Sequence, residues 1–113
     1  MRIGPFRAAK GVVRPRGMNK IETSYAAYLE TLTKAGEILW YQFEPIKLKL
    51  AKGSYYKPDF LVVTKDGFLE IHEVKGFWRE AARVRIKVAA AIYPFNFLAI
   101  QRDRGHWIVE AFE

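Results

Sequence analysis

Cysteine is absent from this 113-residue chain, which excludes disulfide bonds and thiolate metal sites. Any metal ion would therefore need oxygen or imidazole ligands, a donor set that favours hard ions such as Mg²⁺ or Mn²⁺. The chain also has no apolar run of about 18 residues, and no signal-peptide core follows its basic N-terminus. We therefore expect a cytoplasmic protein that does not enter a membrane.

Several common catalytic patterns are missing as well. Neither His72 nor His106 has a second histidine four residues away, so a zinc site is not expected. No serine lies near a histidine and cysteine is absent, which argues against a Ser or Cys nucleophile. No glycine-rich phosphate loop occurs, which argues against nucleotide-driven chemistry.

Positive charge is abundant but unevenly distributed. The net charge is +7, and residues 1–17 carry five basic residues and no acidic one, so most of the excess belongs to this N-terminal arm. A basic arm of this kind is typical of a nucleic-acid-binding extension, with Arg14 and Arg16 as candidate DNA contacts. A disordered solubilising end, or translated sequence upstream of a start at Met18, is the alternative interpretation.

The hydrophobic pattern predicts a single domain over residues 18–113. Helical spacing predicts one helix over 20–35, ended by Gly36, and a second over 79–93, ended by Pro94. Apolar and alternating runs predict strands over 38–43, 46–52, 56–64, 68–75, 95–100 and 107–112. This order, α-β-β-β-β-α-β-β, favours an α/β (α+β) fold in which two helices flank a central mixed sheet.

The segment "KPDFLVVTKDGFLEIHEVKG", residues 57–76, predicts a hairpin with unusual charged groups: Asp59 on one strand, and Glu73 and Lys75 on the other. The length of its loop decides whether the two carboxylates meet. A two-residue loop at positions 66 and 67 would turn Asp59 away from Glu73. A three-residue loop over 65–67, closed by a left-handed glycine, would place position 59 opposite position 73.

In the three-residue register, both carboxylates leave one face of the sheet from Cα atoms about 5 Å apart, and they would repel strongly in a partly buried cleft. A divalent cation would remove the conflict, and hydrolysis of a phosphodiester uses such an ion. Lys75 would then neutralise developing charge or orient the attacking group. The alternative is an exposed ion pair on a solvated sheet face. The same face carries Leu61, Val63, Leu69 and Ile71, which predicts that it is covered, where unpaired charge is costly.

The pair Pro58-Asp59 followed by Glu73-Val74-Lys75 resembles the PD-(D/E)XK motif of the restriction-endonuclease-like nuclease superfamily. The segments "NKIETSYAAYLETL", "WYQFEPIKLKL", "YYKPDFLV", "HEVKGFW" and "ARVRIKVAAAIYPF" extend the similarity to small phage-encoded nucleases over roughly residues 18–100. The resemblance implies a restriction-endonuclease-like core and a phage or prophage origin in a bacterial host. It implies Asp59, Glu73 and the backbone carbonyl of Val74 as ligands of Mg²⁺, which Mn²⁺ can replace, and Lys75 as the catalytic lysine.

The two helices supply further candidates under this resemblance. The first helix of such nucleases often contributes another acid, and Glu22 fits that position, although Asn19 and Glu22 also have the spacing of a helix-capping box. The second helix often carries basic residues near the scissile phosphate. Its candidates for DNA contact are Arg79, Arg83, Arg85 and Lys87. The alternative for these four is an ordinary solvated helix face.

We therefore expect a divalent-metal-dependent endonuclease that hydrolyses DNA and recognises backbone or structure rather than a long base sequence. The alternatives are a catalytically inactive DNA-binding or recombination accessory module of the same fold, and a nuclease acting on RNA. Junctions, flaps, nicks, single strands and duplexes all stay open as substrates. A homodimer would supply the two active sites that cutting both strands of a junction requires.

Overall fold

The computed structural model describes residues 17–112, so Arg14 and Arg16 of the predicted basic arm lie outside the described residues. Within these residues the chain forms two helices, α1 (Lys20–Lys34) and α2 (Glu80–Ile92). Its strands are β1 (Ile38–Phe43), β2 (Leu48–Ala51), β3 (Ser54–Tyr56), β4 (Phe60–Thr64), β5 (Leu69–Lys75), β6 (Asn96–Asp103) and β7 (His106–Phe112).

The expected element order was wrong by one strand, because residues 56–64 do not form one continuous strand. They divide into the end of β3 and the whole of β4, with Pro58 between them. Proline has no N–H to donate to a strand ladder, which explains why the chain changes partners there. The observed order along the described chain is α-β-β-β-β-β-α-β-β.

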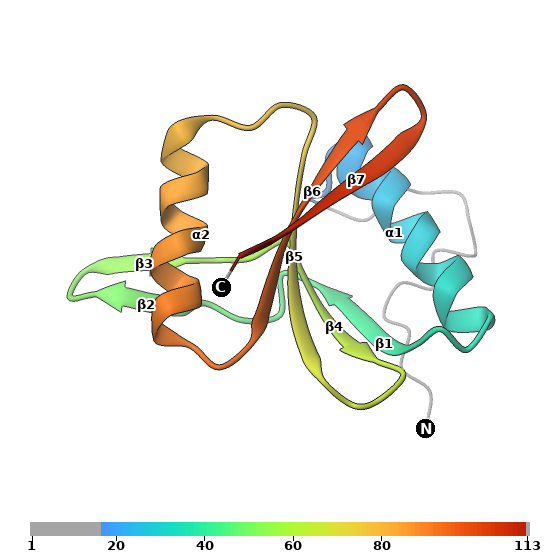
Figure 1. Ribbon diagram of the computed structural model, residues 1–113, viewed down its shortest axis with the longest axis horizontal. Coiled ribbons are helices and arrows are strands. Elements are labelled where there is room, and N and C mark those ends of the chain that lie inside the picture. The colour runs from blue at the N-terminus through green and yellow to red at the C-terminus, as the bar shows by residue number, and fades with distance from the viewer. Residues whose placement is uncertain (1–16, 113) are drawn as a thin grey trace.

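The strands form a five-stranded sheet in the order β1-β4-β5-β6-β7 and a separate two-stranded hairpin of β2 and β3. Within the larger sheet only β5 and β6 are parallel, and α2 makes the crossover between them. Figure 1 shows α1 on one side of this sheet and α2 with the hairpin on the other. The expected α+β architecture, a mixed central sheet with two flanking helices, is confirmed. No helix within residues 17–112 is long and apolar enough to cross a membrane.

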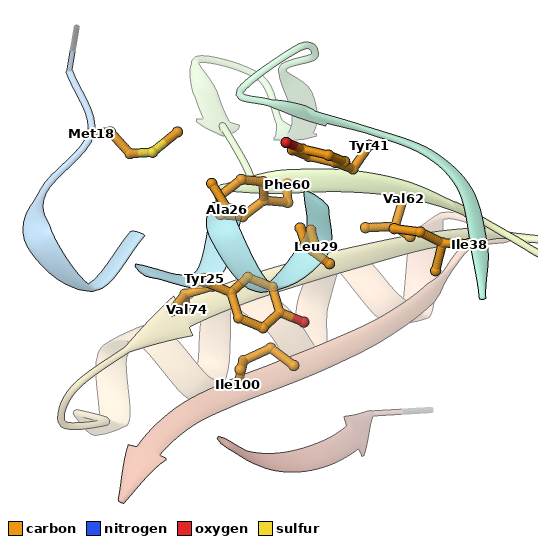
Figure 2. Close-up of a cluster of buried hydrophobic side chains, with 10 residues drawn as sticks. All are labelled: Met18, Tyr25, Ala26, Leu29, Ile38, Tyr41, Phe60, Val62, Val74 and Ile100. Carbon is orange, nitrogen blue, oxygen red and sulfur yellow. The ribbon is translucent and has the colours of Figure 1, made fainter. Parts of the chain in front are cut away.

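One hydrophobic core lies between α1 and the sheet (Figure 2). Helix α1 buries Tyr25, Ala26 and Leu29 at helical spacing, and the strands complete the cluster with Ile38, Tyr41, Phe60, Val62, Val74 and Ile100. Val74 of β5 points into this core. Because side chains alternate along a strand, its neighbours Glu73 and Lys75 point to the opposite face.

A second core fills that opposite face. Ile86 and Ala89 of α2 pack over the sheet with Ile71, Phe97, Ala99 and Phe112, and the hairpin contributes Leu48 and Tyr56. At the end of β5 that holds Glu73, this face of the sheet is therefore covered by α2 and the hairpin. The other end of the same strand is open, since Leu69 is 40% exposed.

The register of the β4–β5 hairpin confirms the three-residue loop. Phe60 pairs with His72 and Val63 with Leu69, which places position 59 opposite position 73. The loop is closed by a hydrogen bond from the Thr64 N–H to the Phe68 carbonyl, and Gly67 has a φ of +90°, a conformation that favours glycine. The turn thus directs the side chains of positions 59 and 73 to the same face.

Candidate active site

Asp59 and Glu73 lie side by side at the covered end of the sheet. Asp59 follows β3 and directly precedes β4, and Glu73 lies near the end of β5. The Asp59 N–H donates to Glu73 Oε1 at 3.1 Å, and the Val74 N–H donates to Asp59 Oδ2 at 2.8 Å. Each of the two residues is only 5% exposed. These reciprocal bonds to backbone hold both predicted carboxylates in place within one small buried region.

Lys75 is the third member of the predicted set, and it lies beside the pair. Its Nζ is 3.3 Å from Glu73 Oε2, and its side chain is 36% exposed while that of Glu73 is 7% exposed. The ammonium group therefore lies where the buried carboxylates meet solvent. The structure brings together Asp59, Glu73 and Lys75 as the sequence predicts.

The electrostatics of this arrangement are unfavourable for two negative charges. Burial, together with the neighbouring charges of Glu73 and Glu22, raises the pKa of the Asp59 carboxyl to about 8 against the opposing effects of the Val74 N–H and Lys75. The metal-free arrangement therefore disfavours a second negative charge at Asp59. A cation placed between the carboxylates would favour the doubly ionised form.

The donor set fits Mg²⁺ or Mn²⁺ better than ions that require a protein cage. Within residues 17–112, no group of three or more His, Cys, Asp or Glu side chains converges closely enough to hold an ion. Mg²⁺ commonly uses one or two carboxylates and completes its shell with water and substrate phosphates. Within the described part of the chain neither Asp59 Oδ1 nor Glu73 Oε2 receives a backbone hydrogen bond, so an ion could use both oxygens, sharing Glu73 Oε2 with the Lys75 ammonium.

Glu22 forms the predicted capping box with Asn19, and its charge also acts on Asp59. The Asn19 N–H donates to Glu22 Oε1 at 3.0 Å, and the Glu22 N–H donates to Asn19 Oδ1 at 2.8 Å, which completes the capping box. Glu22 is only 8% exposed, and its charge contributes to the raised pKa of Asp59. Its participation in catalysis stays a prediction.

Gly76 allows the first turn of α1 to approach the end of β5. A Cβ atom at this position would lie 2.7 Å from Ile21 Cδ1, closer than such contacts normally are. The beginning of α1, with Glu22, thus packs closely against the end of the strand that carries Glu73, and a side chain at position 76 would displace the tip of Ile21.

Tyr56 is a member of the site that the sequence analysis missed. Its hydroxyl donates to Glu73 Oε1 at 2.7 Å, and the residue is 3% exposed. In the sequence it is adjacent to Tyr55, which is 51% exposed, and no local signal distinguishes the two. The bond to Glu73 depends on how the β2–β3 hairpin folds over β5, which is a long-range feature.

We expect Tyr56→Phe to lower the free energy of unfolding by about 1 to 3 kcal/mol, because a buried carboxylate loses a hydrogen bond. Tyr55→Phe removes the same atom from an exposed ring and is the matched control, with an expected change under about 0.5 kcal/mol. Urea unfolding of both variants measures the difference. Equal effects at the two positions would contradict the importance of the Tyr56–Glu73 bond.

The four basic residues predicted on α2 lie in different environments. Arg83 forms a bidentate ion pair with Glu110 of β7, with N–O distances of 2.9 and 2.7 Å, and the charge of Lys87 also acts on Glu110. Arg79 lies near the ring of Phe77, at the exposed start of the helix.

Arg85 is the α2 residue whose charge reaches the carboxylate site. Burial and the adjacent Glu73 raise the pKa of Tyr56, and Arg85 partly offsets that rise. Arg83 and Lys87 are instead oriented toward the edge of the sheet at β7. DNA contact by any of the four stays a prediction, and Arg85 is the one whose charge acts on Tyr56, which bonds to Glu73.

Comparison with known proteins adds a family but no activity. A family model with the description "Protein of unknown function (DUF1064)" matches residues 7–113. No curated protein and no solved structure matches the chain. The geometry of the site is therefore the basis for a functional assignment.

Proposed function

We propose that this chain, which belongs to the DUF1064 family, is a divalent-metal-dependent endonuclease with a restriction-endonuclease-like core that hydrolyses DNA phosphodiester bonds. The observation that carries the proposal is the buried Asp59–Glu73 pair with Lys75 Nζ 3.3 Å from Glu73 Oε2. The resemblance of these residues to the PD-(D/E)XK motif supports the same conclusion.

Asp59 and Glu73 would hold the cation, and the resemblance adds the backbone carbonyl of Val74. When bound, a divalent cation stabilises negative charge on a phosphodiester and makes water more acidic. Lys75 contributes a second positive charge at the solvent side of the pair, where it neutralises a phosphate oxygen or orients the nucleophile. Because the carboxylates are buried, these electrostatic effects are stronger than they would be in bulk water.

Tyr56 and the backbone have a supporting role in this proposal. The Tyr56 hydroxyl and the Asp59 N–H both bond to Glu73 Oε1, which directs Glu73 Oε2 toward Lys75. The Val74 N–H does the same for Asp59 by binding Oδ2. The site is therefore organised by groups that do not have to move during the reaction, which is the condition under which electrostatic stabilisation is most effective.

The test is a nicking assay on supercoiled plasmid with the full chain. We expect nicked and linear products with Mg²⁺ or Mn²⁺ and none with excess chelator. A panel of four-way junctions, flaps, duplexes and single strands then defines the substrate, and matched RNA strands test the alternative nucleic acid. DNA binding without cleavage under any divalent metal would favour the inactive accessory module, and cleavage of RNA alone would overturn the assignment to DNA.

A further inference from the structure

The β2–β3 hairpin is a second charged feature of the molecule. Residues 45–58 contain four lysines and no acidic residue. The hairpin does not join the five-stranded sheet, and Figure 1 shows its tip extending past α2. All four lysines are exposed: Lys47, Lys49, Lys52 and Lys57.

The hairpin has one apolar face and one basic face. Leu48 and Tyr56 are paired across the strands and are buried in the core under α2. Lys49 and Tyr55 form the next pair and point the other way. The hairpin is also attached to α2 by a hydrogen bond from the Tyr93 hydroxyl to the Lys49 carbonyl, at 2.7 Å. The packing therefore orders the backbone and leaves the lysines toward solvent.

An exposed aromatic ring lies among these lysines. The Nζ atom of Lys47 is 5.0 Å from the centre of the Tyr55 ring, and Tyr55 is 51% exposed. This contact orients the Lys47 ammonium along the outer face of the hairpin. We call the outer surface formed by Lys47, Lys49, Lys52 and Tyr55 the hairpin face.

The hairpin face is directly connected to the candidate active site. Tyr56, on the inner side of β3, bonds to Glu73, and Asp59 follows three residues later. At about 3.3 Å per residue along a strand, Tyr55 is about 13 Å of chain from Asp59. Duplex DNA carries one negative charge per about 1.7 Å of its axis, so phosphates flanking a bond at the acidic pair would lie within this range.

Solubility is the competing explanation, because lysines on short exposed strands also prevent aggregation. Three observations favour a role of these lysines in binding a polyanion. Residues 45–58 lack the acids that usually accompany such lysines, the exposed tyrosine is among them, and the same strand contributes to the carboxylate site. The nearest acidic partner is Glu44, whose Oε1 lies 3.8 Å from the Nζ of Lys57, outside the hairpin face.

We infer that the hairpin face binds the sugar-phosphate backbone of DNA beside the acidic pair, and this inference rests on the proposed endonuclease function. Lysine ammonium groups contact phosphates without reading bases, so the contact contributes affinity and placement rather than sequence preference. The inferred surface is distinct from α2 and from the N-terminal arm, where the sequence predicts DNA contacts.

The test compares two double variants with the same change in charge. Lys47→Gln/Lys49→Gln alters the hairpin face. Lys34→Gln/Lys65→Gln is the control. Lys34 is in the last turn of α1, and Lys65 is in the β4–β5 loop, at the opposite end of β5 from Glu73. Anisotropy of a labelled duplex, measured in chelator at several salt concentrations, gives the affinity and its salt dependence. All four positions are exposed, so thermal melting should show both variants folded.

We expect the hairpin variant to bind about ten- to thirtyfold more weakly near physiological salt, with a salt slope reduced by about 2, because two phosphate contacts are lost. The control variant should keep the wild-type slope. Equal losses in both variants would show that net charge alone attracts DNA, and an unchanged hairpin variant would show that this face makes no contact; either result overturns the inference.

Cleavage is measured separately so that the two proposals can fail independently. Binding that depends on the hairpin face, without cleavage by any divalent metal, would retain this inference as a DNA contact and reject the endonuclease function. Metal-dependent cleavage with binding that is independent of the hairpin face would support the endonuclease function and reject the hairpin face as a DNA contact.

Discussion

Glu73→Gln is expected to reduce metal-dependent DNA cleavage about 10²- to 10³-fold while the protein stays folded and still binds DNA. The glutamine keeps the shape of the side chain, and its carbonyl oxygen still accepts hydrogen bonds from the Tyr56 hydroxyl and the Asp59 N–H. What is lost is the charge that would hold the cation, and loss of one preorganised electrostatic group commonly costs about 10²- to 10³-fold in rate. Plasmid nicking under single-turnover conditions measures the effect.

Lys75→Met belongs to the same experiment, because Lys75 supplies the positive charge beside Glu73. Its expected loss is about 10²- to 10³-fold, by the same electrostatic argument. Glu37→Gln and Lys65→Met are the matched controls, since both positions are exposed and lie in turns. Wild-type cleavage rates in both site variants would show that the active site is elsewhere.

The second large expected effect is a dependence of the protein's stability on pH and on a divalent cation. Burial and the adjacent charge of Glu73 raise the pKa of the Asp59 carboxyl from its ordinary 3.8 to about 8 in the folded chain, so the folded state keeps a proton that the unfolded state releases. The free energy of unfolding of the metal-free protein should therefore fall as pH rises from about 4 to 8. The contribution of this single group across the window is on the order of a few kcal/mol. Comparing wild type with Asp59→Asn isolates it, because the asparagine does not titrate.

A divalent cation should oppose this loss. Ion binding requires the ionised pair, so millimolar Mg²⁺ or Mn²⁺ should raise the melting temperature more at pH 8 than at pH 5. Asp59→Asn should abolish most of the stabilisation, and Asp66→Asn, in the exposed β4–β5 loop, should retain it. Thermal melts with and without the ion make the measurement. Identical stabilisation of wild type and Asp59→Asn would exclude Asp59 as a ligand.

The parts of the structure that the sequence predicts well depend on local signals. Helix α1 begins at its capping box and ends at Lys34, two residues before Gly36, which has a φ of +80°. The β4–β5 register follows from one glycine in the left-handed region and the alternation of side chains. The sequence offered a two-residue and a three-residue loop, and the observed three-residue register is the one in which Asp59 and Glu73 meet.

The parts that the sequence does not predict depend on contacts between distant segments. Arg83 meets Glu110, which is 27 residues away, so helical spacing could not show that this arginine is directed toward β7. The bond from Tyr56 to Glu73 required the hairpin to fold back over β5. Pro58 was the one local sign that strand 56–64 is interrupted, since a proline is poorly tolerated inside a central strand.

The location of Glu73 on β5 has a consequence for how the site is lost on denaturation. Strand β5 is the middle strand of the sheet, with β4 and β6 bonded along its two edges. Amide hydrogens in such strands exchange with solvent only during global unfolding, whereas an isolated two-stranded hairpin can open in a local fluctuation. Glu73 therefore lies on a strand that should exchange among the slowest in the domain, and any local opening of the hairpin would break the bond from Tyr56 to Glu73 before the sheet itself unfolds.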